Sequence, residues 1–325
     1  MPRAMVSDRI VTVFGGSGFI GRHVVRALAE RGWRVRNACR RPDLAQHLQP
    51  LGSVGQIVSV QANVRHAPSV RAAIEGADAV VNLVAVLHES GRQTFSDVHV
   101  GGARRVAEAA KAAGVASLVH ISALGADLNS ASAYARTKAE GEAAVMKAFP
   151  NAVIMRPSVV FGPEDQFFNR FAALARFSPV LPLIGGGNTK FQPVFAGDVA
   201  NAVAAALDAK AVPGATYELG GPEVKSFREV LEYILAVTGR KRLLLPLPFR
   251  LASIQAQILQ LLPSPMLTVD QVELLKTDNV VSAAAVKKGR ALENLDVRPT
   301  AIETVVPAYL YRFRKAGQFT DMHTR

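Results

Sequence analysis

Three glycines spaced three residues apart lie where an apolar stretch near the start of the chain gives way to an amphipathic one. The run Val11–Phe14 is typical of a buried strand, and Arg22–Arg31 has helical spacing. Gly15 permits a tight turn, Gly18 lets the backbone approach a pyrophosphate, and Gly21 lets helix and strand pack closely. The helix N-terminus would offer amide donors to phosphate. The pattern predicts a dinucleotide-binding turn; an ordinary strand-to-helix turn is the alternative.

The end of the next predicted strand, Trp33–Cys39, bears on the choice of coenzyme. An NAD site usually has Asp or Glu there, which accepts a hydrogen bond from the ribose 2′-hydroxyl. This chain has Arg40-Arg41-Pro42 instead. A guanidinium binds a 2′-phosphate through paired donors, and Pro42 favours an extended Arg41. The sequence thus predicts a preference for NADP(H), with NAD(H) still open; the alternative is that both arginines are solvated loop charges.

Short apolar segments alternate with alanine-rich segments over the first half of the chain. Such alternation predicts an α/β fold with a doubly wound parallel sheet of the Rossmann type. A ligand crevice is expected beyond the carboxyl ends of its strands. The predicted strands are 57–61, 79–85, 118–122, 152–156 and 216–219, and the predicted helices are 69–75, 101–113, 133–148 and 197–207.

The regular pattern loosens after Pro157, which predicts a smaller, mostly helical C-terminal region that contacts a substrate or partner. A chain of 325 residues with 49% apolar content is long enough for about two structural parts. We predict a flexible N-terminus (1–8), an NADP(H)-binding Rossmann domain (9–161, completed by 191–220), a substrate or partner region (162–190 and 221–311) and a polar tail (312–325).

A second group of candidate residues is catalytic. Ser122 ends the predicted fifth strand, and Tyr134 and Lys138 are four residues apart, hence on one face of the helix that follows. A lysine ammonium beside a phenol favours the phenolate, which suits proton transfer. Lys138 can also hold the nicotinamide ribose, and Ser122 can donate a hydrogen bond to a substrate carbonyl.

The charge of the chain favours anionic partners. Net charge is +12, and the first 41 residues hold nine arginines against two acids. Such a field attracts the cofactor, acidic protein surfaces or anionic lipid headgroups, although an arginine-rich surface without a partner is the alternative. No nucleic-acid-reading motif accompanies the charge, so we expect no nucleic-acid partner.

The remaining composition indicates a protein that stays in the cytoplasm, with a peripheral position on the cytoplasmic membrane face left open. The N-terminus lacks the apolar core of a signal peptide, and the uncharged interval 251–269 is too short and too interrupted to span a bilayer. The single cysteine, Cys39, excludes an internal disulfide, and the scattered histidines predict no metal site. The apolar segment Leu243–Leu262 could contact lipid, quinone or a partner subunit, but burial is the favoured interpretation because large exposed apolar patches are rare.

Taken together, these motifs resemble the short-chain dehydrogenase/reductase superfamily, in its extended and atypical branches, from Ile10 to about Leu310. Within it the chain is similar to the NADPH-binding accessory subunit (39 kDa type) of respiratory complex I and its bacterial relatives. The stretches that carry this second similarity are Phe14–Arg22, Val81–Val84, Arg156–Asp165 and Gln192–Val199.

The resemblance implies a cofactor site along the carboxyl ends of the strands. By that resemblance, the pyrophosphate would be held by Gly15, Ser17, Gly18, Phe19, Ile20 and Gly21, the 2′-phosphate by Arg40, the adenine by Asn63 and Val64, the nicotinamide side by Leu83, Val84 and Ala85, and the nicotinamide cover by Pro157 and Val159.

Two departures from the superfamily pattern bear on catalysis. The usual His-x-Ala-Ala run is replaced by Asn82 to Ala85, and the Asn that usually opens the fourth helix is replaced by His99. Sugar-nucleotide epimerase or dehydratase activity is therefore not expected. Two function classes stay open: an accessory or assembly factor of a membrane NADH:quinone oxidoreductase that holds the cofactor as a structural ligand, and an NADPH-dependent reductase of a hydrophobic carbonyl or quinone-related substrate.

Overall fold

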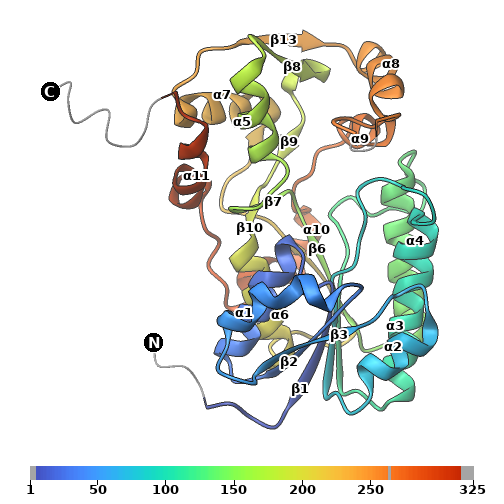
Figure 1. The fold of residues 1–325 in the computed structure, drawn as a ribbon. Coiled ribbons are helices and arrows are strands. Elements are labelled where there is room, and N and C mark those ends of the chain that lie inside the picture. The colour runs from blue at the N-terminus through green and yellow to red at the C-terminus, as the bar shows by residue number, and fades with distance from the viewer. Residues whose placement is uncertain (1–4, 263–264, 316–325) are drawn as a thin grey trace, which may run out of the picture. The chain divides into compact units, whose positions relative to one another are not determined.

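The computed structural model describes residues 5–262 and 265–315 (Figure 1). Backbone contacts divide the chain into two compact units. Unit 1 holds the described residues of Met1–Pro157, Ala196–Leu219 and Val281–Arg298, and unit 2 holds the described residues of the remaining segments. The first four residues of the predicted flexible N-terminus and the last ten of the predicted polar tail lie outside the described residues.

Unit 1 is built on a seven-stranded parallel sheet, which confirms the predicted doubly wound α/β fold. The strand order is β11-β6-β5-β4-β1-β2-β3, so the chain runs outward in both directions from β1. The ligand crevice of such a sheet lies at the point where the order reverses, beyond the carboxyl ends of the strands. The strands are β1 (Ile10–Phe14), β2 (Arg34–Cys39), β3 (Ile57–Gln61), β4 (Ala79–Asn82), β5 (Ser117–Ile121), β6 (Val153–Pro157) and β11 (Thr216–Leu219).

Helices cover the faces of this sheet: α1 packs on α6, and α3 packs on α2 and α4 (Figure 1). The packing follows from helical spacing of small apolar residues; α3 buries Ala103, Val106, Ala107 and Ala110. The helical elements are α1 (Phe19–Glu30), η1 (Pro42–Leu51), α2 (Ala67–Ile74), η2 (Ser96–Gly102), α3 (Ala103–Ala112), α4 (Ala133–Ala148), α6 (Ala196–Leu207), α10 (Ala283–Lys287) and η4 (Leu292–Leu295).

Several boundaries differ from the sequence prediction by one to three residues, and two of the differences lie in segments near the carboxyl end of β4. Strand β4 ends at Asn82 rather than at residue 85, and the helix expected from 101 is preceded by the π-helical segment η2 from Ser96. Helix α4 approaches η2 closely at Gly141, where a Cβ atom would lie 2.3 Å from the carbonyl oxygen of His99. π-helical segments such as η2 are frequent at functional sites, because their wider turn changes the direction of the side chains.

The last part of unit 1 comes from late in the sequence. Glu218 of β11 forms a parallel bridge with Ala291, and its backbone N–H donates to the Arg290 carbonyl at 2.9 Å. The Arg290 guanidinium also donates to the Tyr217 hydroxyl at 2.8 Å. Residues 281–298 thus extend the edge of the Rossmann sheet and belong to unit 1, in contrast to the prediction that assigns them to the substrate or partner region 221–311.

Unit 2 consists of short strand pairs and helices around an aromatic core. Its core includes Phe161, Phe168 and Phe227, and the hydroxyl of Tyr309 donates to the buried Asp165 carboxylate at 2.6 Å. In the described part of the chain no helix is both long and apolar enough to traverse a bilayer. The elements are β7 (Val160–Phe161), α5 (Phe168–Phe177), β8 (Val180–Ile184), η3 (Gly185–Gly187), β9 (Lys190–Phe191), β10 (Val194–Phe195), β12 (Lys225–Ser226), α7 (Phe227–Thr238), β13 (Leu243–Leu247), α8 (Phe249–Leu259), α9 (Val269–Leu274), α11 (Ile302–Leu310) and η5 (Tyr311–Phe313).

Candidate nucleotide and catalytic site

A cavity of about 270 Å³ opens at the carboxyl ends of β1, β2, β3 and β4, entirely within unit 1. It lies where the strand order predicts a ligand crevice. Its lining residues are Phe14, Gly15, Ser17, Gly18, Ala38, Cys39, Arg40, Ala62, Asn63, Val64, Arg65, Leu83, Val84, Ala85, Val86, Gln93 and Val98.

The glycine turn forms one wall of this cavity. Gly15 has φ +83°, a conformation that L side chains rarely adopt, and its N–H donates to the Ala38 carbonyl at 3.3 Å. A Cβ atom at Gly21 would lie 2.2 Å from the Gly15 carbonyl oxygen, so α1 can begin this close to β1 only with glycine there. The turn leaves backbone, not side chains, facing the cavity, which fits the diphosphate of a dinucleotide.

Two arginines line the cavity near its rim. Arg40 donates from Nη1 to the Gln93 Oε1 at 2.5 Å, and Arg65 donates from Nη1 to the Arg92 carbonyl at 2.6 Å. Within the described residues, neither guanidinium has a carboxylate within ion-pair distance. Arg41 differs, since its side chain is 69% exposed, lies 3.6 Å from Asp43 and does not line the cavity. Positive charge without an acidic partner at this rim fits a phosphate group.

The lining residues can be compared with the predicted cofactor site. Phe19, Ile20 and Gly21 lie in the first turn of α1, and Tyr134 and Lys138 lie on α4; none of these lines the cavity. Pro157 ends β6 in unit 1, and Val159 belongs to unit 2. Nine predicted residues do line it, namely Gly15, Ser17, Gly18, Arg40, Asn63, Val64, Leu83, Val84 and Ala85.

The other lining residues were not predicted, namely Phe14, Ala38, Cys39, Ala62, Arg65, Val86, Gln93 and Val98. Arg65 and Cys39 follow or end predicted strands, so the rule that parallel strands end at one sheet edge could have found both. Gln93 lies in a loop that carries no comparable signal.

Asn82 and His99, the two residues that depart from the superfamily pattern, both accept hydrogen bonds from the backbone of the loop after β4. The Asn82 Oδ1 accepts from the Val84 N–H at 3.2 Å, which orients its amide so that Nδ2 donates to His120 Nδ1 at 3.2 Å. The His99 Nε2 accepts from the Val86 N–H at 3.1 Å. Val84 and Val86 line the cavity, so these two polar side chains fix one of its walls.

His99 is neutral and has one tautomer in this arrangement. Because Nε2 accepts, the proton is on Nδ1, which donates to the Thr137 Oγ1 at 3.0 Å on α4. Burial, helped by the positive charge of Lys138, lowers the pKa of His99 to about 3. The ring of Tyr134 packs edge-on against the imidazole, with 5.3 Å between centroids. His99 therefore links the cavity wall to the helix that carries Tyr134.

The predicted catalytic residues occupy the region where β5 meets α4. Lys138 is buried, and its Nζ donates to the Ile121 carbonyl at 2.8 Å, which places the ammonium beside the residue that precedes Ser122. Burial lowers the pKa of Lys138 to about 8, and the carboxylate of Glu142 opposes this shift. The Ser122 Oγ is buried and has no hydrogen-bond partner in the described part of the chain. A buried hydroxyl of this kind fits a ligand oxygen.

A mostly buried ion pair lies one helical turn beyond Lys138. Glu142 accepts two hydrogen bonds from the Arg156 guanidinium on β6, at 2.9 and 2.6 Å. The two side chains are 10% and 26% exposed, respectively. The hydrogen bonds to Glu142 raise the pKa of Arg156. The pair ties α4 to the sheet beside the candidate site.

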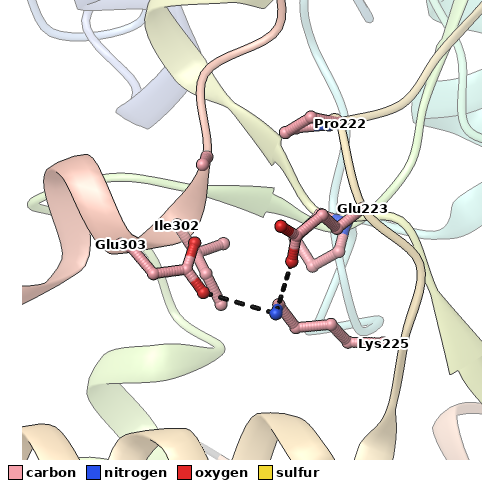
Figure 2. Close-up of a pocket in the computed structure, with 7 residues that line it drawn as sticks. Pro222, Glu223, Lys225, Ile302 and Glu303 are labelled. Atoms are coloured by element: carbon pink, nitrogen blue, oxygen red, sulfur yellow. Dashed lines mark ion pairs between the residues drawn. The ribbon is translucent and has the colours of Figure 1, made fainter.

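A second, much smaller pocket lies in unit 2 (Figure 2). Its volume is about 10 Å³, roughly the room for one water molecule. The Lys225 ammonium points between two carboxylates there, 2.6 Å from Glu223 and 3.3 Å from Glu303 (Figure 2). The three charges connect the β12 region to the start of α11, so this pocket is a structural ion-pair cluster rather than a ligand site.

The chain is similar to several known proteins in sequence or in fold. A subunit 9 of the NADH dehydrogenase [ubiquinone] 1 alpha subcomplex from Arabidopsis thaliana is 36% identical over 97% of this chain and 80% of its own length. A ceramide reductase from Caulobacter vibrioides is 36% identical over 54% of each chain. The structure of an NADPH-dependent quinone oxidoreductase from Escherichia coli, complexed with NADPH, is 20% identical with a TM-score of 0.73, covering 93% of this chain and 99% of that one.

The family relationship predicted from the motifs is also confirmed. The model of the NAD dependent epimerase/dehydratase family matches residues 11–220, from β1 to the residue after β11. That range includes the glycine turn, every lining residue of the cavity, and Ser122, Tyr134 and Lys138. The chain therefore belongs to the NAD dependent epimerase/dehydratase family.

Proposed function

We propose that this protein is an NADP(H)-binding accessory or assembly factor of a membrane NADH:quinone oxidoreductase, peripheral on the cytoplasmic membrane face, with the dinucleotide as a structural ligand. The observation that carries the cofactor proposal is the cavity at the glycine turn, with Arg40 and Arg65 at its rim and no carboxylate paired with either among the described residues. The similarity to the Arabidopsis subunit, which extends over nearly the whole chain, supports the accessory role.

A bound dinucleotide would stabilise the folded chain through linkage. A ligand that binds only the folded state adds to the free energy of unfolding in proportion to the logarithm of its concentration over its Kd. The cavity walls come from four neighbouring strands, so a dinucleotide there would connect segments that are distant in sequence. Arg40 and Arg65 would hold the 2′-phosphate, and the backbone from Gly15 to Gly18 would hold the diphosphate.

The cofactor assignment predicts that arginine substitutions discriminate between the two coenzymes. Arg40→Ala and Arg65→Ala should each weaken NADPH binding by about tenfold or more, because each removes a charge-assisted hydrogen bond to the 2′-phosphate. NADH affinity should change by less than about twofold, since NADH lacks that phosphate. Arg41→Ala is the comparison variant; a smaller loss is expected from its exposed position. Calorimetric titration with each coenzyme measures these affinities.

The single cysteine provides an independent readout. Cys39 lines the cavity and is 8% exposed, so bound NADPH should slow its reaction with a thiol reagent. Wild-type chain whose Cys39 reacts at the same rate with and without saturating NADPH would contradict the proposed site. Equal losses of NADPH and NADH affinity in the arginine variants would contradict the 2′-phosphate assignment.

A second candidate function is an NADPH-dependent reductase of a hydrophobic carbonyl compound. The buried, unpartnered Ser122 Oγ favours it, and so does the similarity to the ceramide reductase. When bound, NADPH would supply the hydride. Ser122 would donate a hydrogen bond to the carbonyl oxygen, and the Tyr134 hydroxyl would deliver the proton, with the Lys138 charge favouring its phenolate form.

Tyr134→Phe separates the two functions. Under the reductase function, this change should reduce NADPH oxidation with a carbonyl substrate by about 100-fold or more, because proton transfer typically contributes that much, while NADPH affinity is retained. The measurement is absorbance loss of NADPH with a long-chain ketone. Turnover that is unaffected by the change, or absent from the wild-type chain, would contradict the reductase function.

A further inference from the structure

Helix α8 in unit 2 has its apolar face turned outward. Its buried side chains are Ala252 and Ala256, which are four residues apart and face inward. The larger residues Leu251, Ile254 and Ile258 lie on the opposite face and are 55%, 56% and 68% exposed. A surface helix of a globular protein normally has the reverse arrangement. The favoured interpretation of Leu243–Leu262 as a buried segment is therefore wrong for this face of α8, although Leu244, Leu247 and Phe249 do pack against the core.

The exposed apolar surface continues on both sides of α8. Leu243 and Leu245, two residues apart and so on one face of β13, are 63% and 52% exposed, and Leu261 after α8 is 82% exposed. The Leu243 N–H donates to the Pro179 carbonyl at 3.0 Å, which places β13 beside Phe177, itself 83% exposed. Figure 1 shows β13 leading into α8 along the edge of this unit. We name the exposed side chains of Phe177, Leu243, Leu245, Leu251, Ile254, Ile258 and Leu261 the α8 patch.

Cations flank this patch, and carboxylates are absent from its sequence. The interval between Glu232 and Asp270 contains no acidic residue. The Arg242 Nε donates to the Ala175 carbonyl at 2.8 Å, beside Arg176. Desolvation and repulsion from Arg242 and Arg176 together lower the pKa of the Arg240 guanidinium, so these positive charges lie close together.

Arg176, Arg240 and Arg242 form a basic rim beside the patch, and two further cations extend it. Lys241 lies between Arg240 and Arg242 in the sequence, and Arg250 lies on α8 next to Leu251. Within the described residues, no carboxylate lies within ion-pair distance of Arg176, Arg240, Lys241, Arg242 or Arg250. A large apolar face beside unpaired cations is typical of segments that lie in a membrane interface. Each cation near an anionic bilayer strengthens binding by about fivefold.

We infer that the α8 patch and its basic rim bind the surface of an anionic lipid bilayer, with the apolar side chains inserted among the acyl chains and the arginines and lysine on the headgroups. The inference deepens the proposed peripheral position and rests on it, but it assigns the contact to lipid rather than to a protein subunit. The combination of a wide apolar face with a cationic rim favours the bilayer, because acyl chains and anionic headgroups complement both at one surface.

The test is co-sedimentation of the full chain, saturated with NADPH, with two kinds of vesicle: phosphatidylcholine alone, and phosphatidylcholine mixed with phosphatidylglycerol. We expect the partition coefficient to be at least about tenfold higher on the anionic vesicles. Changing Arg176, Lys241 and Arg250 together to Gln should lower it by about fivefold per cation removed. The matched control changes Lys111, Lys147 and Lys287, three exposed lysines of unit 1, to Gln. It should leave the partition coefficient nearly unchanged.

The apolar contribution is tested separately. Ile254→Gln with Ile258→Gln should lower partitioning by about tenfold, since both side chains leave water on insertion. Its control is Val54→Gln with Val286→Gln, two exposed apolar residues of unit 1. Equal partitioning onto both kinds of vesicle would overturn the inference, and so would patch variants that partition like the wild type. A dimer in size-exclusion chromatography that the isoleucine changes dissociate would also overturn it, because a second copy would then cover the patch.

The two proposals fail in different ways. If the chain binds NADPH and co-purifies with respiratory subunits but does not bind anionic vesicles, only the lipid inference is overturned. If wild-type chain binds anionic vesicles but Cys39 is not protected by NADPH, only the cofactor part of the proposed function is overturned.

Discussion

On acidification, wild-type protein should lose about 3 kcal/mol more of its free energy of unfolding than the His99→Asn variant, between about pH 7 and about pH 4.5. The folded protein holds His99 neutral, with its pKa lowered to about 3, whereas in the unfolded chain the pKa is near 6.5. As the pH falls below 6.5, the unfolded state takes up the proton first. The stabilisation from the neutral ring is therefore complete above pH 6.5 and is lost as the pH falls toward 3.

Urea unfolding at a series of pH values measures this difference. Comparing how the free energy of unfolding changes with pH in the two proteins cancels the pH dependence that other titratable groups contribute to both. His47→Asn is the matched control, because it removes an exposed histidine from η1 and should retain the wild-type dependence. Parallel pH profiles for wild type and His99→Asn would show that His99 is not held neutral. Such a result would also remove the reason for its single tautomer and for its role in fixing the cavity wall.

Glu142→Gln should lower the free energy of unfolding by about 3 kcal/mol at neutral pH. The change leaves the Arg156 guanidinium, only 26% exposed, without its charged partner, and an uncompensated charge in a mostly buried position is costly. It also removes the carboxylate that opposes the downward pKa shift of Lys138. Chemical denaturation of both proteins provides the measurement.

A second Glu→Gln change on a helix of the same unit supplies the control. Glu108 pairs with Arg104 four residues away, but both side chains are more than half exposed, and such pairs contribute less than about 1 kcal/mol. Combining Glu142→Leu with Arg156→Met should recover much of the lost stability, because apolar groups replace both charges. If Glu142→Gln and Glu108→Gln had equal effects, the pair beside Lys138 would be no more than a surface contact.

Much of the candidate cofactor site could be predicted because its parts are local in sequence. The turn conformation at Gly15 and the close approach at Gly21 depend on a few adjacent residues. The ends of neighbouring parallel strands then bring Arg40, Asn63 and Leu83 to one sheet edge without any long-range detail. Gln93 was not predictable in this way, because its place beside Arg40 depends on the path of a loop.

Which face of α8 is buried could not be predicted from the sequence. Its helical spacing could be read from the sequence, but spacing alone does not say which face is inside. The alanines at 252 and 256 occupy the inward face, and the larger residues Ile254 and Ile258 lie outside. The rarity of large exposed apolar patches favours burial of the larger residues, and that interpretation is wrong for the outer face of α8.

The order of the amino acids is enough to predict the strand–turn–helix unit, the parallel sheet and most of the residues that line the cavity, because each follows from local spacing and from the common edge of the strands. Asn82 and His99 look like losses relative to the superfamily pattern, but in the folded chain they accept hydrogen bonds from the backbone N–H groups of Val84 and Val86 in one cavity wall. The ion pair between Glu142 on α4 and Arg156 on β6 was likewise not visible in the sequence. Hydrogen bonds and ion pairs of this kind join residues from different elements, so they exist only once the chain has folded.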